Sequence, residues 1–200
     1  MTGFLLVVGY FAVAGLAAVI ALQPSHFTVT RSAVIDAPPN VVFRHINELR
    51  NWEAWSPWAK LDPAAQNEYE GPASGPGAAF AWTSAKSEVG AGRMTIVDSR
   101  PNQAVTFKLE MKRPFAATND VSFSLAPEPG EAPSRGGWWF SRLLGFGPDA
   151  QHTTRTVVTW TMSGKNTIIS KVMNVVMNMD KMVGGQFEKG LANLNGMFAR

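Results

Sequence analysis

The sequence predicts an α+β fold in which a curved antiparallel sheet packs around one long C-terminal helix, behind a single N-terminal transmembrane helix. Three observations predict it: a charge-free apolar run at the start, alternating apolar residues through the middle, and a helical apolar stripe at the end. A length of 200 residues suits one domain with an appendage. We therefore expect an anchor and linker at 1–25 and a domain at 26–200, with an insert at about 127–152.

The apolar run covers residues 3–22 and contains no charged residue and no proline. A helix of about 20 residues spans about 30 Å, the thickness of the hydrocarbon core of a bilayer. A cleaved signal peptide is the alternative, but it would show a basic start and a small-residue cleavage site. The chain starts Met-Thr-Gly, and residues 19–21 match a cleavage site weakly. We favour a retained, single-pass anchor in the cell membrane.

Charge sets few limits on location and partners. Arg31 is the basic residue nearest the apolar run, which favours a domain on the cytoplasmic side without fixing it. The 18 Lys and Arg exceed the 15 Asp and Glu by only three and form no basic stripe, so we expect no nucleic-acid partner. The absence of cysteine fits either compartment and excludes disulfides and thiolate metal sites.

Two kinds of local pattern open the domain. Residues 27–35 are rich in β-branched side chains and predict a strand. The turn Asp36-Ala-Pro-Pro predicts the start of a helix that runs to about Leu49, because proline is tolerated in the first helical turn. A second short helix is expected from Asn51 to Trp55, ended by Pro57.

The middle of the chain changes to a period of two, which predicts five or six antiparallel strands with one apolar face. The side chains expected on that face are Ala78, Phe80, Trp82, Met94, Ile96, Val105, Phe107, Leu109, Met111, Val121, Phe123, Leu125, Val158, Trp160 and Met162. The charged residues Arg93, Asp98, Lys108 and Glu110 fall on the opposite face. Gly and Pro residues between these segments mark the turns.

The C-terminal segment returns to helical spacing. Its apolar stripe predicts one helix of some thirty residues. The stripe consists of Ile169, Val172, Val176, Met179, Val183, Phe187, Leu191, Leu194 and Phe198. Gly184 and Gly185 interrupt it, so we expect a bend or a close approach there.

The insert at 127–152 is rich in Pro and Gly, yet it contains a dense apolar cluster. The cluster consists of Trp138, Trp139, Phe140, Leu143, Leu144 and Phe146. Exposed apolar patches usually mark interaction sites, so we expect contact with the membrane interface or with a protein partner. The alternative is that the cluster folds back over the sheet.

Several stretches carry a family resemblance. Residues 27–58, FTVTRSAVIDAPPNVVFRHINELRNWEAWSPW, resemble the opening of SRPBCC proteins, the START-like group of polyketide cyclase/dehydrase and lipid-transport proteins. The stretches YEGPASGPGAAFAW, GRMTIVDSRPN, RTVVTWTMSG and FEKGLANL look like later landmarks of that group. The resemblance implies a helix-grip fold with an apolar cavity between the sheet and the C-terminal helix. It implies less about function, since the group includes enzymes, carriers and sensors.

Three tryptophans, Trp52, Trp55 and Trp58, lie within the first part of this resemblance. Large aromatic rings suit either a core or a ligand contact. The resemblance places the segment beside the cavity mouth, so we expect Trp55 and Trp58 to pack into the cavity end and Trp52 to lie nearer the surface. Packing and ligand contact remain equally open.

The expected cavity offers little for catalysis or metal binding. His26, His45 and His152 are scattered, and His45 is expected as a partly exposed surface residue. We predict no catalytic residue, no metal and no cofactor. The predicted ligand-cavity residues are Trp55, Trp58, Phe80, Trp82, Met94, Phe107, Met111, Phe123, Trp160, Met162, Val176, Met179 and Val183.

Three hypotheses for function follow. We favour membrane-tethered binding or carriage of a hydrophobic, lipid-like small molecule. The second is a non-catalytic accessory subunit of a membrane protein complex, with the anchor and the insert as its contacts. A cyclase or dehydratase is the third, and it would need polar groups that strand alternation does not place in the cavity.

Overall fold

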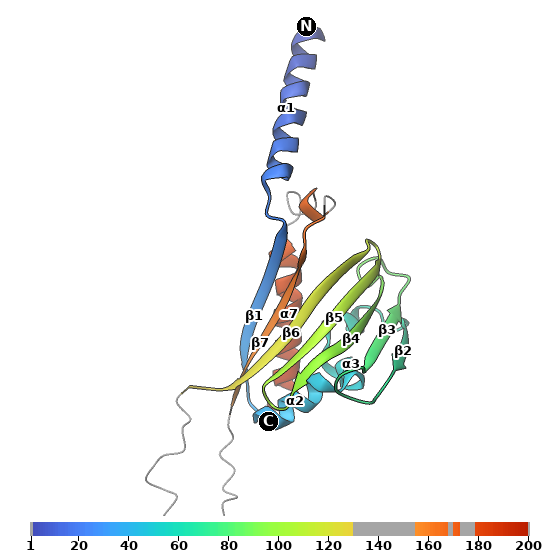
Figure 1. Cartoon of the computed structure of the whole chain (residues 1–200), viewed down its shortest axis with the longest axis vertical. Coiled ribbons are helices and arrows are strands. Elements are labelled where there is room, and N and C mark those ends of the chain that lie inside the picture. The colour runs from blue at the N-terminus through green and yellow to red at the C-terminus, as the bar shows by residue number, and fades with distance from the viewer. Residues whose placement is uncertain (1, 130–154, 168–169, 173–178, 200) are drawn as a thin grey trace, which may run out of the picture.

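The structure is a computed structural model that describes residues 2–129, 155–167, 170–172 and 179–199 (Figure 1). Its centre is a seven-stranded antiparallel sheet with the order β1-β7-β6-β5-β4-β3-β2. The strands are β1 (His26–Ile35), β2 (Gln66–Glu70), β3 (Ala79–Thr83), β4 (Ala91–Arg100), β5 (Ala104–Arg113), β6 (Ala117–Pro127) and β7 (Thr156–Lys165). The first strand therefore pairs with the last, from His26 opposite Lys165 to Ile35 opposite Thr156.

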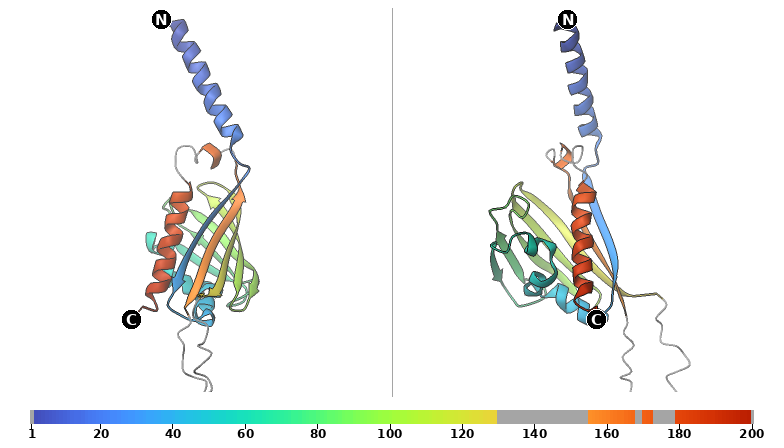
Figure 2. Two further views of the ribbon diagram at one scale, coloured as in Figure 1. Left: turned by 90° about the vertical axis from the view of Figure 1, so that its left-hand side faces the viewer. Right: turned by 180° about the vertical axis from the view of Figure 1, so that it is seen from behind.

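The helices are α1 (Thr2–Leu22), α2 (Pro39–Asn47), α3 (Trp52–Trp55), α4 (Pro57–Leu61) and α7 (Met179–Gly196), with a 3₁₀ turn, η1, at Leu49–Asn51. Helix α7 lies along one face of the sheet beside β1, as the two views in Figure 2 show. The curved antiparallel sheet and the long C-terminal helix confirm the predicted helix-grip arrangement.

Two elements differ from the expectation. The edge strand β2 was not predicted, because its sequence QNEYE is polar and places only Tyr69 partly out of solvent. The predicted short helix is found as α3, which ends at Trp55 before Pro57 as expected. Pro57 then begins α4, a further short helix that was not predicted, and its missing N–H costs no hydrogen bond there.

The described part of the C-terminal helix has the predicted apolar face. Phe187, Leu191 and Leu194 are fully buried in it. Ile169 and Val176 lie outside the described residues, so the thirty-residue helix stays a prediction over that part. Val172 is 41 % exposed and does not extend the buried stripe.

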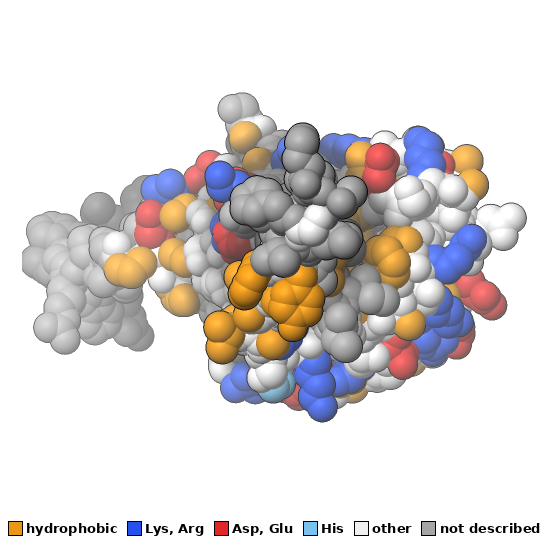
Figure 3. All heavy atoms as spheres, turned by 90° about the horizontal axis from the view of Figure 1, so that it is seen from above, with side chains coloured by type: hydrophobic (Ala, Val, Ile, Leu, Met, Phe, Trp, Pro, Cys, Tyr) orange, Lys and Arg blue, Asp and Glu red, His pale blue; other side chains and the backbone are white. Residues whose placement is uncertain are grey.

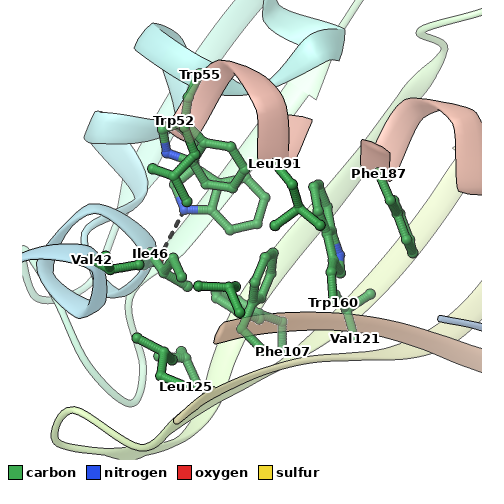
Figure 4. Close-up of a cluster of buried hydrophobic side chains, with 14 of the residues drawn as sticks. Val42, Ile46, Trp52, Trp55, Phe107, Val121, Leu125, Trp160, Phe187 and Leu191 are labelled. Atoms are coloured by element: carbon green, nitrogen blue, oxygen red, sulfur yellow. Dashed lines mark hydrogen bonds between the residues drawn. The ribbon is translucent and has the colours of Figure 1, made fainter. Parts of the chain in front are cut away.

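The tryptophan segment lies in the core between the short helices, the sheet and α7 (Figure 4). Trp55 is fully buried and Trp52 is only 6 % exposed, so the expectation of Trp52 near the surface is wrong. The indole N–H of Trp52 donates to the carbonyl of Ile46 at 2.9 Å, and that of Trp55 donates to the carbonyl of His45 at 3.3 Å. These carbonyls close α2, whose last turn leaves acceptors without helical partners. The two buried indole N–H groups thus supply donors to the free carbonyl groups at the end of α2.

Helix α1 stands clear of the sheet (Figure 1). Its Tyr10, Phe11 and Leu22 side chains are largely exposed, while many of its other side chains are not described. Among the residues that are described, no helix is long and apolar enough to cross a membrane.

Gly190 lies at a close contact of α7 with the core. A Cβ at this position would lie 2.8 Å from the Trp160 ring and 3.2 Å from Cδ of Pro57. Gly185, on another side of the same helix, has no heavy atom within 4 Å of such a Cβ. One helix therefore carries a glycine required by packing and a glycine in open space.

We expect Gly190→Ala to destabilise the fold by about 1–3 kcal/mol, because the methyl group overpacks the Trp160 ring. We expect Gly185→Ala to be neutral or to stabilise by up to about 1 kcal/mol, because alanine is the better helix former. Urea unfolding of both variants measures the difference. Equal effects would mean that α7 does not approach Trp160 so closely.

Candidate functional site

The predicted cavity residues divide by burial into a packed set and a half-exposed set. The packed set, under 9 % exposed, consists of Trp55, Met94, Phe107, Phe123, Trp160 and Met162. The half-exposed set consists of Trp58, Phe80, Trp82, Met111 and Val183. The structure does not describe Val176 or the side chain of Met179.

Rings of the packed set contact one another directly. The Trp160 ring stacks on Phe187 with centroids 4.2 Å apart and planes at 8°, and its centroid lies 4.6 Å from that of Phe123. Trp55 meets Trp160 edge to face at 5.7 Å. These aromatic contacts pack α7 against β6 and β7. Contact of these residues with a ligand stays a prediction.

One polar atom in this packed set has no partner. The Nε1 atom of Trp160 is buried and donates no hydrogen bond within the described part of the chain. A buried N–H without an acceptor costs about 1–3 kcal/mol, so such a group usually meets a water molecule or a ligand atom. Trp160 therefore carries a buried donor for which the described residues supply no acceptor.

Half-exposed rings form a row on the inner face of the sheet at its β2–β3 edge. Phe80 stacks between Tyr69, at 5.2 Å and 30°, and Trp82, at 5.5 Å and 21°. Trp82 fixes its ring by donating from Nε1 to the carbonyl of Val89 at 3.1 Å. The ring lies across Gly92, where a Cβ would come within 2.8 Å of it. We call Tyr69, Phe80 and Trp82 the aromatic row.

The row ends in a polar cap at Tyr69. The Tyr69 hydroxyl donates to Oε1 of Glu53 at 2.8 Å, and the guanidinium carbon of Arg50 lies 4.4 Å from its ring centroid. Burial, followed by the nearby Glu53 carboxylate, raises the pKa of Tyr69. Tyr69 therefore stays protonated at neutral pH. Sequence reasoning missed it, because the polar strand β2 gives no alternating signal.

Trp58 and Val183 face the same side from the helices. Trp58 meets Trp160 edge to face at 5.9 Å and Phe187 at 6.3 Å, so it extends the packed core toward solvent. Val183 is partly buried against the same core. The inner face thus changes from a packed core to a partly uncovered aromatic surface.

An ion-pair clamp joins α7 to β1. Arg31 donates from Nη2 to Oδ2 of Asp180 at 2.9 Å and from Nε to Oε1 of Glu188 at 2.7 Å. The hydrogen bond from Arg31 lowers the pKa of the Asp180 carboxyl. A Cβ at Gly184 would collide with the guanidinium, so the close approach predicted at Gly184-Gly185 is found at Gly184. Sequence reasoning assigned Arg31 only to membrane topology.

A hollow of about 1050 Å³ lies at the end of the sheet nearest α1. Met111 of the predicted set borders it, together with polar side chains that include His26, Lys108, Lys112 and Lys165. Two cations of its wall are already paired: Lys108 with Asp120 at 2.9 Å, and Arg93 with Glu70 at 2.6 Å. This hollow is more polar than the cavity expected from the sequence.

The predicted contact cluster, Trp138, Trp139, Phe140, Leu143, Leu144 and Phe146, lies outside the described residues. The ends of the insert are described. Pro127 pairs with Thr156 at the end of the sheet opposite α1, and Arg155 bridges Glu128 at 2.9 Å and Asp36 at 3.0 Å. Over the ranges given above, no three His, Asp and Glu side chains converge as metal ligands.

His45 on α2 is partly buried, as expected. Its ring meets Phe198 edge to face at 5.4 Å, and its Nδ1 atom is buried with no partner among the residues described. Burial lowers the pKa of His45 below 6.5, and the charge of Arg44 lowers it further, against an opposing effect of Glu48. The folded protein therefore favours the neutral imidazole.

Residues 26–196 match the sequence pattern of the polyketide cyclase / dehydrase and lipid transport family. No curated protein matches the chain. Among solved structures, protein MLL2253 from Mesorhizobium loti is similar with a TM-score of 0.54 and 17 % identity over 87 % of this chain and 100 % of that one. XoxI from Bacillus cereus has a TM-score of 0.54 and 14 % identity, over 88 % and 96 %. Protein CV1439 from Chromobacterium violaceum has a TM-score of 0.52 and 11 % identity, over 88 % and 97 %. At these identities the structures show a shared fold.

Mutation can distinguish the packed set from the half-exposed set of predicted cavity residues by its effect on stability. We expect Trp160→Ala to cost about 3–5 kcal/mol of stability, because it empties a packed position. Trp82→Ala at the half-exposed row should cost about 1–2 kcal/mol, because less apolar surface is lost from burial. Chemical unfolding measures both. A small cost for Trp160→Ala would mean that its ring lines a filled space instead of a solid core.

Stability should fall as the pH drops below about 6.5, the ordinary value for His45, because the unfolded chain then binds a proton that the folded chain resists. One such group gives a slope of at most about 1.4 kcal/mol per pH unit. Urea unfolding between pH 7.5 and roughly pH 5, above the range of most carboxylates, measures it. His45→Gln should flatten this slope, and an unchanged slope in the variant would assign it to another group.

Proposed function

The chain belongs to the polyketide cyclase / dehydrase and lipid transport family, and on this premise we propose that it binds and carries a hydrophobic, lipid-like small molecule while tethered to a membrane by α1. The ligand lies on the inner face of the sheet, between the aromatic row and α7. Its apolar part covers the half-exposed rings, and a polar oxygen accepts from Trp160 Nε1.

The aromatic row is the observation that carries this proposal. Phe80 and Trp82 are stacked and held in place, yet they remain partly open to solvent. Covering such rings with an apolar ligand gains about 25 cal/mol for each Å² removed from water. The unpartnered N–H of Trp160 supports a ligand with at least one acceptor atom.

The tether rests on α1. Residues 3–22 are free of charge, and the helix Thr2–Leu22 points away from the domain. Because many side chains of α1 are not described, the support for a span comes from the sequence: twenty consecutive residues without charge suit the hydrocarbon core of a bilayer. A tethered carrier would exchange its ligand with the same membrane. The soluble domain on the cytoplasmic side is the orientation we favour.

The chemistry of the inner face supports binding over catalysis. Tyr69 is the ionisable group of the aromatic row, and its raised pKa keeps it neutral and hydrogen-bonded to Glu53. General acid–base catalysis needs a group that changes protonation near the working pH. Carriage requires no such group.

Native mass spectrometry of the full chain, released from nanodiscs made from its own membranes, tests the proposal. We expect a hydrophobic adduct on the wild type and at least a fivefold lower occupancy on Phe80→Ala/Trp82→Ala, because the variant removes the surface that the adduct covers. Val97→Ala is the control, because Val97 is 52 % exposed on β4 and lies outside the aromatic row.

Wild-type protein without any adduct would contradict the proposal, as would equal occupancy in the double variant. A protein that copurifies in fixed ratio, in place of a lipid, would instead support an accessory subunit of a membrane complex.

A further inference from the structure

The antiparallel order of the sheet places a defined set of residues at the end nearest α1. Strand β1 begins there at His26, opposite the last residue of β7, Lys165. Strand β5 ends there at Arg113, and β6 begins at Ala117. The hairpin tip 114–116 between β5 and β6 therefore lies at the same end as the exit of α1 (Figure 1).

A short, pinned linker keeps this end close to α1. Only Gln23, Pro24 and Ser25 separate α1 from β1. Asn166 donates from its backbone N to the carbonyl of Ser25 at 2.8 Å and from Nδ2 to the carbonyl of Pro24 at 3.0 Å. Three residues reach at most about 10 Å, so a bilayer that contains α1 lies about that far from this end of the sheet.

Basic side chains that form no ion pair with a described residue gather at this end. The hydrogen bond from Arg93 lowers the pKa of the Glu70 carboxyl, and one of these bases, Lys112, lies near enough to add to that effect. Lys112, Arg113 and Lys165 are exposed, and none of them forms an ion pair within the described ranges. Acids without an ion pair among the same residues also lie toward this end, among them Glu110 on β5, Glu68 on β2 and Glu88 in the turn before β4. Seen from the α1 end, Lys and Arg side chains lie around the rim of the domain, with some Asp and Glu among them (Figure 3).

An exposed aromatic side chain lies among these bases. Phe115 is 48 % exposed at the hairpin tip, next to Pro114 and two residues from Arg113. A solvated hairpin gains nothing from an exposed phenyl ring. A ring flanked by cations suits the interfacial zone of a bilayer, where the ring enters the headgroup layer and the cations meet lipid phosphates and carboxylates.

We propose that this end of the domain, formed by Lys112, Arg113, Phe115 and Lys165, docks on the anionic lipid surface of the bilayer that holds α1. The inference rests on the tether in the proposed function and adds an orientation to it. Docking holds the sheet upright on the membrane, with the region between the sheet and the start of α7 turned toward the lipid. A carried lipid then enters without crossing bulk water.

The chain contains no cysteine, so one introduced cysteine labels one position. The full chain is reconstituted as Phe115→Cys, carrying an environment-sensitive NBD fluorophore, into phosphatidylcholine vesicles with or without phosphatidylserine. Val97→Cys is the matched control, since Val97 is similarly exposed but lies toward the other end of β4. Quenching by spin-labelled lipids then reports contact with the bilayer.

We expect strong quenching at position 115 in the anionic vesicles, weak quenching at position 97, and a loss of the signal at high salt. Each basic residue near an anionic surface contributes about a fivefold gain in surface partitioning. Lys112→Gln/Arg113→Gln/Lys165→Gln should therefore lower the ratio of docked to undocked domain at least tenfold. Equal quenching at the two positions, or no loss in the triple variant, would overturn the docking.

Flotation after alkaline extraction, done on the same samples, separates the two proposals. Chains that float but show no quenching at position 115 retain the tether and disprove only the docking. Chains that do not float, or that start near Leu22 after processing in cells, disprove the tether and the docking together. The adduct measured by mass spectrometry does not depend on either result.

Discussion

Pairing of the first strand with the last sets the positions of nearly everything else in this molecule. Residues 26 and 165 lie opposite each other although about 140 positions separate them in sequence, so the intervening hairpins must close into one sheet between them. Such non-local contacts are reached late in folding, because loop closure costs entropy before the contact forms. The pairing places β1 beside α7, and it brings Arg31 to Asp180 and Glu188. It also sends α1 and the insert to opposite ends of the sheet.

The alternation of apolar residues was enough to predict the sheet, because side chains on a half-buried strand obey a period of two. It assigned Phe107, Phe123 and Trp160 to the buried face correctly. The failures have separate causes. Strand β2 lies at the edge and buries almost nothing, so no period marks it. Trp52 is buried because its N–H has an acceptor at the end of α2, a partner that no local pattern reveals.

The candidate site was predictable in composition but not in arrangement. The alternation of apolar residues selected rings that do lie on one face. It could not separate the rings packed against α7 from the rings that remain partly exposed to solvent. That distinction depends on where α7 lies across the sheet, and helix placement is set by contacts such as Gly190 against Trp160. The same limit applies to Tyr69, whose strand was missed. The apolar face of this sheet is therefore divided between a packed part under α7 and a partly exposed part at the β2–β3 edge.

Strand pairing and ion pairs both hold the two ends of the insert together. Pro127 and Thr156 are the last paired positions of β6 and β7, and the Glu128 backbone N donates to the carbonyl of Arg155 at 2.9 Å just beyond them. Arg155 then bridges Glu128 and Asp36. A loop whose two ends are held together in this way can change length at little cost, since each doubling of its length adds only about 0.6 kcal/mol of closure entropy. A reporter domain placed between these two ends would therefore leave the register of the sheet intact.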